Sequence, residues 1–301
     1  MESDFFVFMI EKYLEYIEVE RRYSPHTIVS YKKDLQDFQS FVLETEGEED
    51  LRRIGKKVVR NFMVFLSEKK LSKRSINRKL SSLRSFYLFL LKVQEIEVSP
   101  LESISSLKFY PEKQVPLSRE EVSDLQNIDL HGDLKLEFFS LLVEVLYQTG
   151  MRRMELCDLK KQDVDFSKLE IRVHGKGNKM RVLPISEELA KQLASYAKGR
   201  GASRESEPYF FLAPKGGKLG EKFVYLGVKS YLSLVTSKEK KSPHILRHSF
   251  ATHVLENGAE ISRVKNLLGH ASLASTQVYT HSDIAQLKKV FEKAHPRAKK
   301  K

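Results

Sequence analysis

The sequence reads Ser242-Pro243-His244-Ile245-Leu246-Arg247-His248-Ser249-Phe250 in its last quarter. Serine is a favoured N-cap residue and proline suits the first position of a helix, so a helix is predicted to begin at Pro243. His244 and Arg247 then lie three residues apart on one face of that helix. Two side chains that can carry positive charge are therefore expected to share one patch.

Two further features follow this helix at short intervals. A second apolar run, residues 261–268, ends at Gly269, a residue type that commonly terminates helices. His270 comes directly after this glycine, and Tyr279 follows nine residues later. Cationic side chains and a tyrosine at successive helix ends predict a site for an anionic substrate with a hydroxyl nucleophile.

The composition favours a polyanionic partner. The 301 residues include 52 lysines and arginines against 40 aspartates and glutamates, a formal net charge of +12. This excess favours nucleic acid, although a basic protein whose charge serves only solubility is a common alternative. The length suffices for two domains, and 41% hydrophobic residues suffice to bury a core in each.

The single cysteine, Cys157, excludes an internal disulfide framework and a cysteine-rich zinc site. It lies in an apolar-patterned run, so a buried, unreactive thiol is expected. The first four residues are acidic, unlike the start of a signal peptide, and no apolar run reaches the roughly eighteen residues of a membrane span. We therefore expect a cytoplasmic protein with no membrane partner.

The first hundred residues are predicted to be all-helical. Apolar side chains recur at intervals of three and four in the segments 5–20, 25–41, 58–66 and 76–91. The polar face of the last helix and its N-terminal turn carry a basic cluster that consists of Arg74, Arg78, Lys79 and Arg84, beside Lys73. Such charges usually form a solvated surface, and contact with DNA phosphates is the second interpretation.

A linker is predicted between two domains. Three prolines lie between residues 100 and 116, in a stretch of mixed polar residues. We place the linker at residues 109–117, which leaves an N-terminal domain of residues 1–108 and a second domain of residues 118–301.

The second domain is predicted to be mostly helical with a small antiparallel sheet. Residues 169–174 and 180–184 alternate as two strands, joined by a turn that contains Lys176. Taken alone, a lysine between two glycines is most often a soluble loop residue. Residues 209–212 are a candidate further strand.

An arginine and a carboxylate stand close together earlier in the second domain. Arg152 precedes a helical turn and Glu155 follows three residues later, where a carboxylate can hold an arginine in place. A surface ion pair is the common alternative for such a pair.

Five motifs occur in a fixed order. They are Thr149-Gly150-Met151-Arg152-Arg153-Met154-Glu155-Leu156, Gly175-Lys176-Gly177-Asn178-Lys179, His244-Ile245-Leu246-Arg247-His248, Leu267-Leu268-Gly269-His270 and Tyr279. This ordered set resembles the tyrosine recombinase (phage integrase) family, most closely its Xer (XerC/XerD-like) branch. Each motif is weak alone, but the five in order are specific. Resemblance covers nearly the whole chain, because residues 24–31 and 80–87 are similar to that family's N-terminal domain.

The resemblance implies roles for seven side chains. These are Tyr279 as the nucleophile, Arg152 and Arg247 as ligands of the scissile phosphate, Lys176 as the general acid, His244 and His270 as further members of the site, and Glu155 as the support of Arg152.

These residue types suit phosphoryl transfer. Attack of a phenol on a phosphodiester builds charge on two non-bridging oxygens, which two guanidinium groups can neutralise without a metal. The leaving 5′-oxygen needs a proton, which a lysine or histidine can donate. A tyrosine with a pKa of about 10 is protonated at pH 7, so the cationic site must assist its attack. The tyrosine ester keeps the energy of the broken bond, and no cofactor is therefore expected.

Three alternatives stay open at this point. Four histidines, at positions 244, 248, 253 and 270, could bind zinc, although no carboxylate lies nearby and two arginines would repel a cation. A DNA-binding protein without activity would lack at least one catalytic residue, and none of the six is missing. A type IB topoisomerase uses similar chemistry, but the N-terminal domain and the short segment after Tyr279 favour recombination.

The resemblance also implies an assembly. A SAM-like core-binding domain, residues 1–108, and the catalytic domain would form a C-shaped clamp on double-stranded DNA at a recombination site. Residues 283–293 should form an amphipathic helix that docks on its own subunit or, as in the family, on the adjacent protomer of a tetramer. The tetramer would contain this chain alone or a paralogous recombinase. Strand exchange through a Holliday junction would resolve chromosome dimers before cell division, with a septal DNA translocase (FtsK-like) as a further partner.

Overall fold

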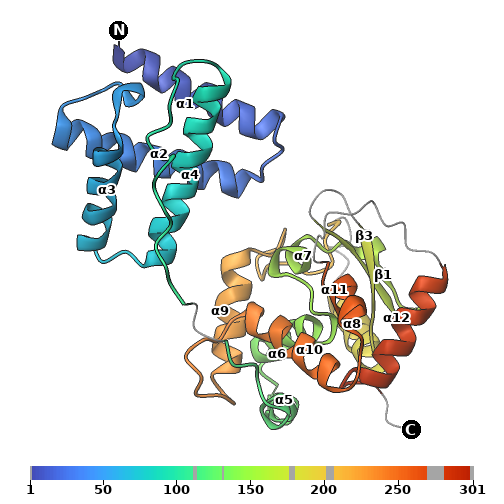
Figure 1. Cartoon of the computed structure of the whole chain (residues 1–301). Helices are drawn as coiled ribbons and strands as arrows, with labels where there is room; N and C mark the ends of the chain where they lie inside the picture. Colours follow the sequence, from blue (N-terminus) through green and yellow to red (C-terminus); the bar gives the residue numbers. More distant parts are fainter. Residues whose placement is uncertain are drawn as a thin grey trace. The chain divides into compact units, whose positions relative to one another are not determined.

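The computed structural model describes residues 2–110, 114–130, 132–175, 180–200, 207–269 and 281–298, including their side chains except those of 2–7 and 281–287. The chain divides into two compact units, Met1–Glu112 and Lys113–Lys301 (Figure 1). Within the described ranges, no helix is both long and apolar enough to cross a lipid bilayer.

The first unit is helical, as predicted. Its helices are α1 (Glu2–Val19), α2 (Pro25–Glu46), α3 (Lys56–Glu68) and α4 (Lys73–Lys92), with a short 3-10 turn at Leu51–Arg53. Ser24 and Ser72 cap α2 and α4, since their hydroxyl oxygens accept hydrogen bonds from the backbone N–H groups of Thr27 and Ser75. The buried faces of the helices meet in an aromatic core that includes Phe38, Phe62, Phe86 and Tyr87.

One carboxylate, that of Asp34, is fully buried between α2 and α4. It accepts hydrogen bonds from Arg78 Nη2 at 2.8 Å, Lys79 Nζ at 3.0 Å and the Ser82 hydroxyl at 3.2 Å. Lys79 is itself buried and also pairs with Asp37. A buried charge is tolerated only when it is paired in this way, so this cluster fixes how the two helices pack.

The second unit combines helices with a small sheet, as predicted. Its elements are α5 (Arg119–Asp124), α6 (Leu134–Thr149), α7 (Arg153–Asp158), a 3-10 turn (Lys161–Asp163), β1 (Val164–Asp165), β2 (Glu170–His174), β3 (Met180–Pro184), α8 (Glu187–Gly199), α9 (Glu221–Leu232), α10 (Pro243–Glu256), α11 (Ile261–Leu268) and α12 (His281–Ala294). The three strands pair antiparallel in the order β1-β2-β3, with Arg172 opposite Val182.

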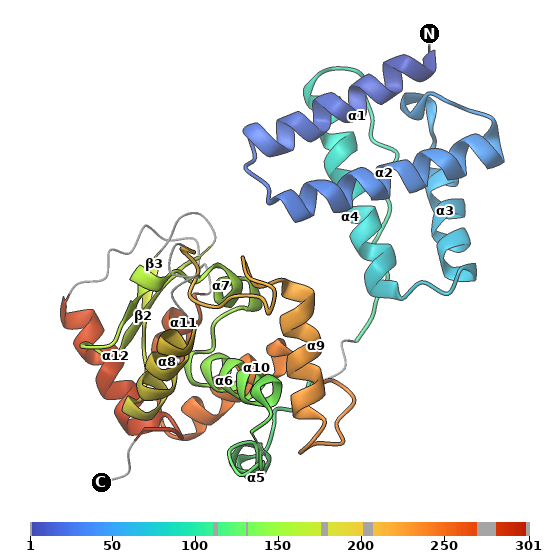
Figure 2. The ribbon, with the colours of Figure 1, turned by 180° about the vertical axis from the view of Figure 1, so that it is seen from behind.

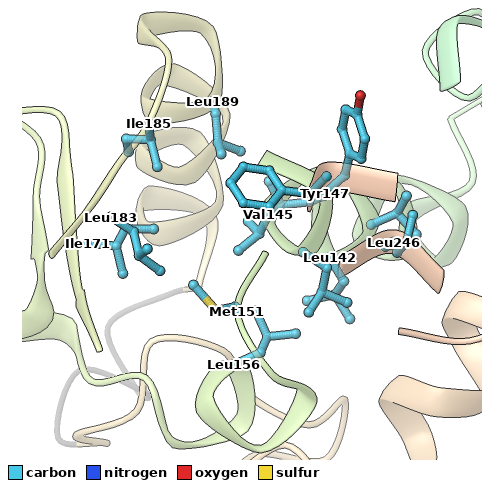
Figure 3. Packing of buried hydrophobic residues seen from close by; sticks show 14 of the residues in the cluster. Leu142, Val145, Tyr147, Met151, Leu156, Ile171, Leu183, Ile185, Leu189 and Leu246 are labelled. Atoms are coloured by element: carbon cyan, nitrogen blue, oxygen red, sulfur yellow. The ribbon is translucent and has the colours of Figure 1, made fainter. Parts of the chain in front are cut away.

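Helix α6 forms the centre of this unit (Figures 1 and 2). Its buried side chains contact α8, α9 and α10, because it is apolar around nearly its whole circumference. Leu142 and Val145 of α6 pack with Leu246 of α10 and with Ile171 and Leu183 of the sheet in one core (Figure 3). Cys157 belongs to the same core, so its predicted burial is confirmed, and this burial raises the pKa of its thiol to about 11.

One local prediction in this unit was wrong, and one helix was missed. Residues 209–212 form isolated bridges, Lys160 to Tyr209 and Leu212 to Lys218, instead of a strand. Their aromatic side chains, Phe210 and Phe211, are buried in the core, which explains the strand-like composition. Helix α9 was not predicted.

The C-terminal helix α12 packs on its own unit. Lys288 forms an ion pair of 2.8 Å with Glu170 of β2. Beyond the helix end, Arg297 Nε lies 2.8 Å from the carboxylate of Glu144 in α6, and the ring of His295 stacks on Phe291 at 4.5 Å. Of the two docking modes expected for this helix, the isolated chain adopts the intramolecular one.

Replacing Asp34 with alanine should destabilise the first unit by about 3 kcal/mol, because Lys79 would lose an anion in a buried position. Asp37→Ala is the matched control: its side chain is 43% exposed and it contacts the same lysine. We expect it to cost less than about 1 kcal/mol. Hydrogen exchange of the α2 and α4 amides measures both changes, and equal losses would contradict this account.

Replacing Gly150 with alanine should destabilise the second unit by clearly more than the same change at Gly258. Both glycines have positive φ, +60° and +88°, where a Cβ costs about 1–2 kcal/mol. At Gly150 the new Cβ would also lie 2.6 Å from Phe250 Cδ1, whereas nothing lies within 4 Å at Gly258. Thermal unfolding compares the two variants; a similar loss for both would show that close packing at Gly150 is unimportant.

Candidate active site

The first predicted phosphate ligand, Arg152, lies at the N-terminus of α7. Gly150 ends α6 in the left-handed conformation, and two residues later the extended backbone of Arg152 precedes α7. Glu155, in the first turn of α7, accepts hydrogen bonds from the backbone N–H of Arg152 at 2.6 Å and from its Nη1 at 3.0 Å. Glu155 is only 8% exposed, whereas the Arg152 side chain is 41% exposed, so the pair is half-buried and anchored on its carboxylate side.

The second predicted phosphate ligand, Arg247, lies in α10 and is 8% exposed. Its Nη1 donates to the carbonyl oxygen of Gly150 and its Nη2 to that of Leu268, each at 2.6 Å. Burial, followed by the neighbouring guanidinium groups of Arg152 and Arg181, lowers the pKa of Arg247 to about 10. The side chain therefore remains positively charged at neutral pH.

A third arginine, Arg181, completes this cluster, and none of the sequence motifs includes it. Its Nη1 and Nη2 donate to the two carboxylate oxygens of Glu155 at 2.8 and 2.7 Å. Burial alone would raise the pKa of Glu155, but the bonds and charge of Arg181, followed by those of Arg152, hold it below the ordinary value. The carboxylate is consequently ionised at neutral pH.

The three arginines converge on the C-terminus of α11. The consecutive carbonyl oxygens of this helix end accept one bond each: Leu267 from Arg181 at 2.8 Å, Leu268 from Arg247 at 2.6 Å and Gly269 from Arg152 at 3.1 Å. Carbonyl groups at a helix C-terminus lack intrahelical partners and attract cations. The helix end therefore fixes the positions of three charged side chains from three other elements.

The remaining predicted site residues divide into two groups. His244 lies exposed in the first turn of α10, one turn before Arg247. Lys176, His270 and Tyr279 lie outside the described residues. In the sequence, Lys176 directly follows the described residue Gly175, and His270 directly follows Gly269.

The histidines proposed as alternative zinc ligands do not cluster where the structure describes them. His253 is buried and its Nδ1 lies 2.9 Å from the Tyr147 hydroxyl, whereas His248 Nε2 contacts the Gln114 carbonyl oxygen at 3.0 Å. Among the described residues, no three histidine, cysteine or carboxylate side chains form a group that could hold a metal ion.

The basic residues predicted on α4 have different surroundings. Arg74 is exposed in the first turn. Arg78 and Lys79 bond to Asp34, and Arg84 donates to the carbonyl oxygen of Ile104 at 2.7 Å. Much of the charge in this cluster is therefore engaged within the first unit.

Comparisons with known proteins agree with this architecture. Residues 117–286 match the phage integrase family, and residues 10–94 match the phage integrase N-terminal SAM-like domain. Relatives named Tyrosine recombinase XerC include that of Chlorobaculum parvum, 37% identical over 96% of this chain and 94% of the relative. That of Bacillus licheniformis is 38% identical over 96% of both chains.

Two solved structures share the fold. The Tn1549 transposon integrase, in complex with a circular intermediate DNA, aligns over 94% of this chain and 99% of that chain, with a TM-score of 0.72 and 19% identity. The XerH site-specific recombinase bound to difH aligns over 87% of this chain and 78% of that chain, with a TM-score of 0.68 and 24% identity. From the family match and the similarity to full-length relatives, we conclude that this chain belongs to the phage integrase family, the tyrosine recombinases.

Proposed function

We propose that this protein is a site-specific DNA recombinase, which cuts and rejoins duplex DNA through a 3′-phosphotyrosine intermediate and a Holliday junction. The observation that carries the proposal is the convergence of Arg152 and Arg247 on the helix end that directly precedes His270. Two arginines from distant parts of the sequence are held together there, as a phosphate ligand requires. Membership of the family and a net charge of +12 support DNA as the substrate.

In the proposed reaction, the phenolic oxygen of Tyr279 attacks the scissile phosphorus, and the bond from phosphorus to the 5′-oxygen breaks. Lys176 donates a proton to this leaving oxygen, and His244 or His270 takes up the phenolic proton. Arg152 and Arg247 bind the non-bridging oxygens. Attack by the 5′-hydroxyl of another strand reverses the same step, which needs neither metal nor nucleotide.

The charge of the site favours the transition state over the bound substrate. Three arginines and one glutamate leave a charge of +2 among the described residues of the cluster. A phosphodiester carries one negative charge, whereas its five-coordinate transition state approaches two. Electrostatic stabilisation therefore increases as the reaction proceeds, which is the requirement for catalysis.

Both units would contact the DNA. The helical unit would act as the core-binding domain and the second unit as the catalytic domain. Of the four basic residues proposed to contact phosphates, exposed Arg74 is best suited, because Lys79 is already held by Asp34 and Asp37. Arg78 and Arg84 already donate hydrogen bonds within the first unit. They could contact a DNA phosphate only through guanidinium N–H groups that these bonds do not use.

The active form would be a tetramer on DNA, formed by this chain alone or with a paralogous recombinase. Docking of α12 on an adjacent protomer would first break the ion pair of Lys288 with Glu170, and movement of the residues after the helix would break that of Arg297 with Glu144. Resolution of chromosome dimers before cell division is the proposed biological role, consistent with the name of the relatives. A septal DNA translocase (FtsK-like) is the proposed activator.

Replacing Tyr279 with phenylalanine should abolish covalent attachment to DNA and leave DNA binding intact, since only the nucleophilic oxygen is lost. The probe is a nicked duplex selected for tight binding from a pool with a randomised centre. Incubation without metal or nucleotide should give a denaturation-resistant protein–DNA band with the unchanged protein only.

Tyr209→Phe serves as the matched control, because it removes the hydroxyl of a partly exposed tyrosine that is not among the proposed site residues. A band of normal intensity from Tyr279→Phe would refute the assignment of the nucleophile. Absence of a band from the unchanged protein, despite tight binding, would instead support a DNA-binding protein without this activity.

A further inference from the structure

We propose that Arg181 is a positioning residue for the phosphate-binding arginines. This inference rests on the proposed function, and it adds a residue whose role neither the motifs nor the expected chemistry includes. Arg181 is only 4% exposed, so its guanidinium group is enclosed by protein. Its effect on a DNA phosphate must therefore pass through the groups it touches.

The first of these groups is Glu155. Arg181 binds both carboxylate oxygens, at 2.8 and 2.7 Å, in the forked geometry that fixes the plane of a carboxylate. The same two oxygens accept from Nη1 and the backbone N–H of Arg152. Because Arg152 is held by a carboxylate whose orientation Arg181 sets, movement of Arg181 would change the direction of the Arg152 guanidinium group.

The second group is the C-terminal end of α11. The Nε of Arg181 donates to the Leu267 carbonyl oxygen at 2.8 Å. A Cβ added to Gly269 would lie 3.2 Å from Arg181 Nη1, so the guanidinium group also rests against the residue that precedes His270. Arg181 thereby joins β3, the first turn of α7 and the end of α11, where Arg152 and Arg247 have their carbonyl partners.

Stability alone is a weak explanation for this arrangement. A buried ion pair often adds little net stability over apolar residues of similar volume, since both charges lose their hydration. Here the pair brings a third positive charge beside two arginines that already repel each other; burial, followed by the charges of Arg152 and Arg181, lowers the pKa of Arg247. This electrostatic cost is consistent with a role of Arg181 in orienting the other two arginines, because a displacement of about 1 Å at a reacting group can reduce the rate ~100-fold.

Lysine cannot replace this arginine. It would place one compact charge near Glu155 and could not bind both carboxylate oxygens and the Leu267 carbonyl oxygen in one plane. We therefore expect Arg181→Lys to reduce the rate of covalent DNA cleavage by about 10-fold and Arg181→Gln by about 100-fold, while DNA affinity stays within about threefold.

The decisive measurement compares two nicked duplexes of the same selected sequence. One has an ordinary scissile phosphate, and the other has a methylphosphonate, in which a methyl group replaces one charged oxygen. The methylphosphonate develops less negative charge in the transition state, so misplaced arginines should reduce its cleavage rate by a smaller factor. The cleavage defect of Arg181→Gln should therefore shrink at least severalfold on the methylphosphonate. Each variant acts on both duplexes from one preparation, so the fraction of folded protein cancels in the ratio.

The matched control is Arg172→Gln on the neighbouring strand, whose arginine side chain is 41% exposed and lies outside this cluster. It should cleave both duplexes like the unchanged protein. If the cleavage defect of each Arg181 variant is as large on the methylphosphonate duplex as on the ordinary duplex, the positioning role is overturned. Normal cleavage of the ordinary duplex by both variants would also overturn it. If the unchanged protein forms no tyrosine-dependent adduct, the proposed function fails, and this inference fails with it.

Discussion

The carboxylate of Glu155 lies between the guanidinium groups of Arg152 and Arg181, nearly enclosed by protein, and the arginine cluster of the second unit is arranged around this contact. An unpaired charge in such a position would reduce the stability of the fold by several kcal/mol. The carboxylate can therefore be buried only together with its arginine partners. The end of α11 adds three carbonyl oxygens that orient the arginines without neutralising them. The positive charge therefore remains available for a substrate.

In the proposed mechanism, this arrangement separates the orientation of the arginines from the binding of phosphate. Carbonyl groups and Glu155 direct the guanidinium groups before any DNA arrives, so little reorganisation is needed during the reaction. Close packing supports the same geometry. Gly150 both accepts a bond from Arg247 and allows Phe250 to approach where any side chain would collide. A substitution at this glycine would thus disturb the core and the site together.

Local features of the fold could be predicted because their causes are local. The predicted start of α10 at Pro243 is confirmed, because the fixed φ of proline suits the first position of a helix. Helix α9 was missed because aromatic and β-branched residues and Gly227 weaken its helical signal. That glycine is explained only by the fold, since a Cβ there would lie 2.2 Å from Phe139 Cε1.

Part of the site could also be predicted, because some of its residues belong to short, local motifs. Short motifs drew attention to Arg152, Glu155 and Arg247, and the structure brings these three together with their partners. Burial of Glu155 and the role of Arg181 depend on contacts between β3, α7 and α11, which are distant in sequence. In the sequence, Arg181 looks like one residue of an alternating strand, where a polar side chain is expected to face solvent. Only the packing of the sheet against α11 shows that it is buried.

The most direct test of the account is to identify the atom that becomes linked to DNA. Covalent adducts formed without metal or nucleotide would be digested with protease and nuclease, and the peptide that carries a nucleotide would be sequenced by mass spectrometry. The account predicts a 3′-phosphate ester on the hydroxyl of Tyr279. A nucleotide on another side chain, or a linkage through a 5′-phosphate, would contradict it.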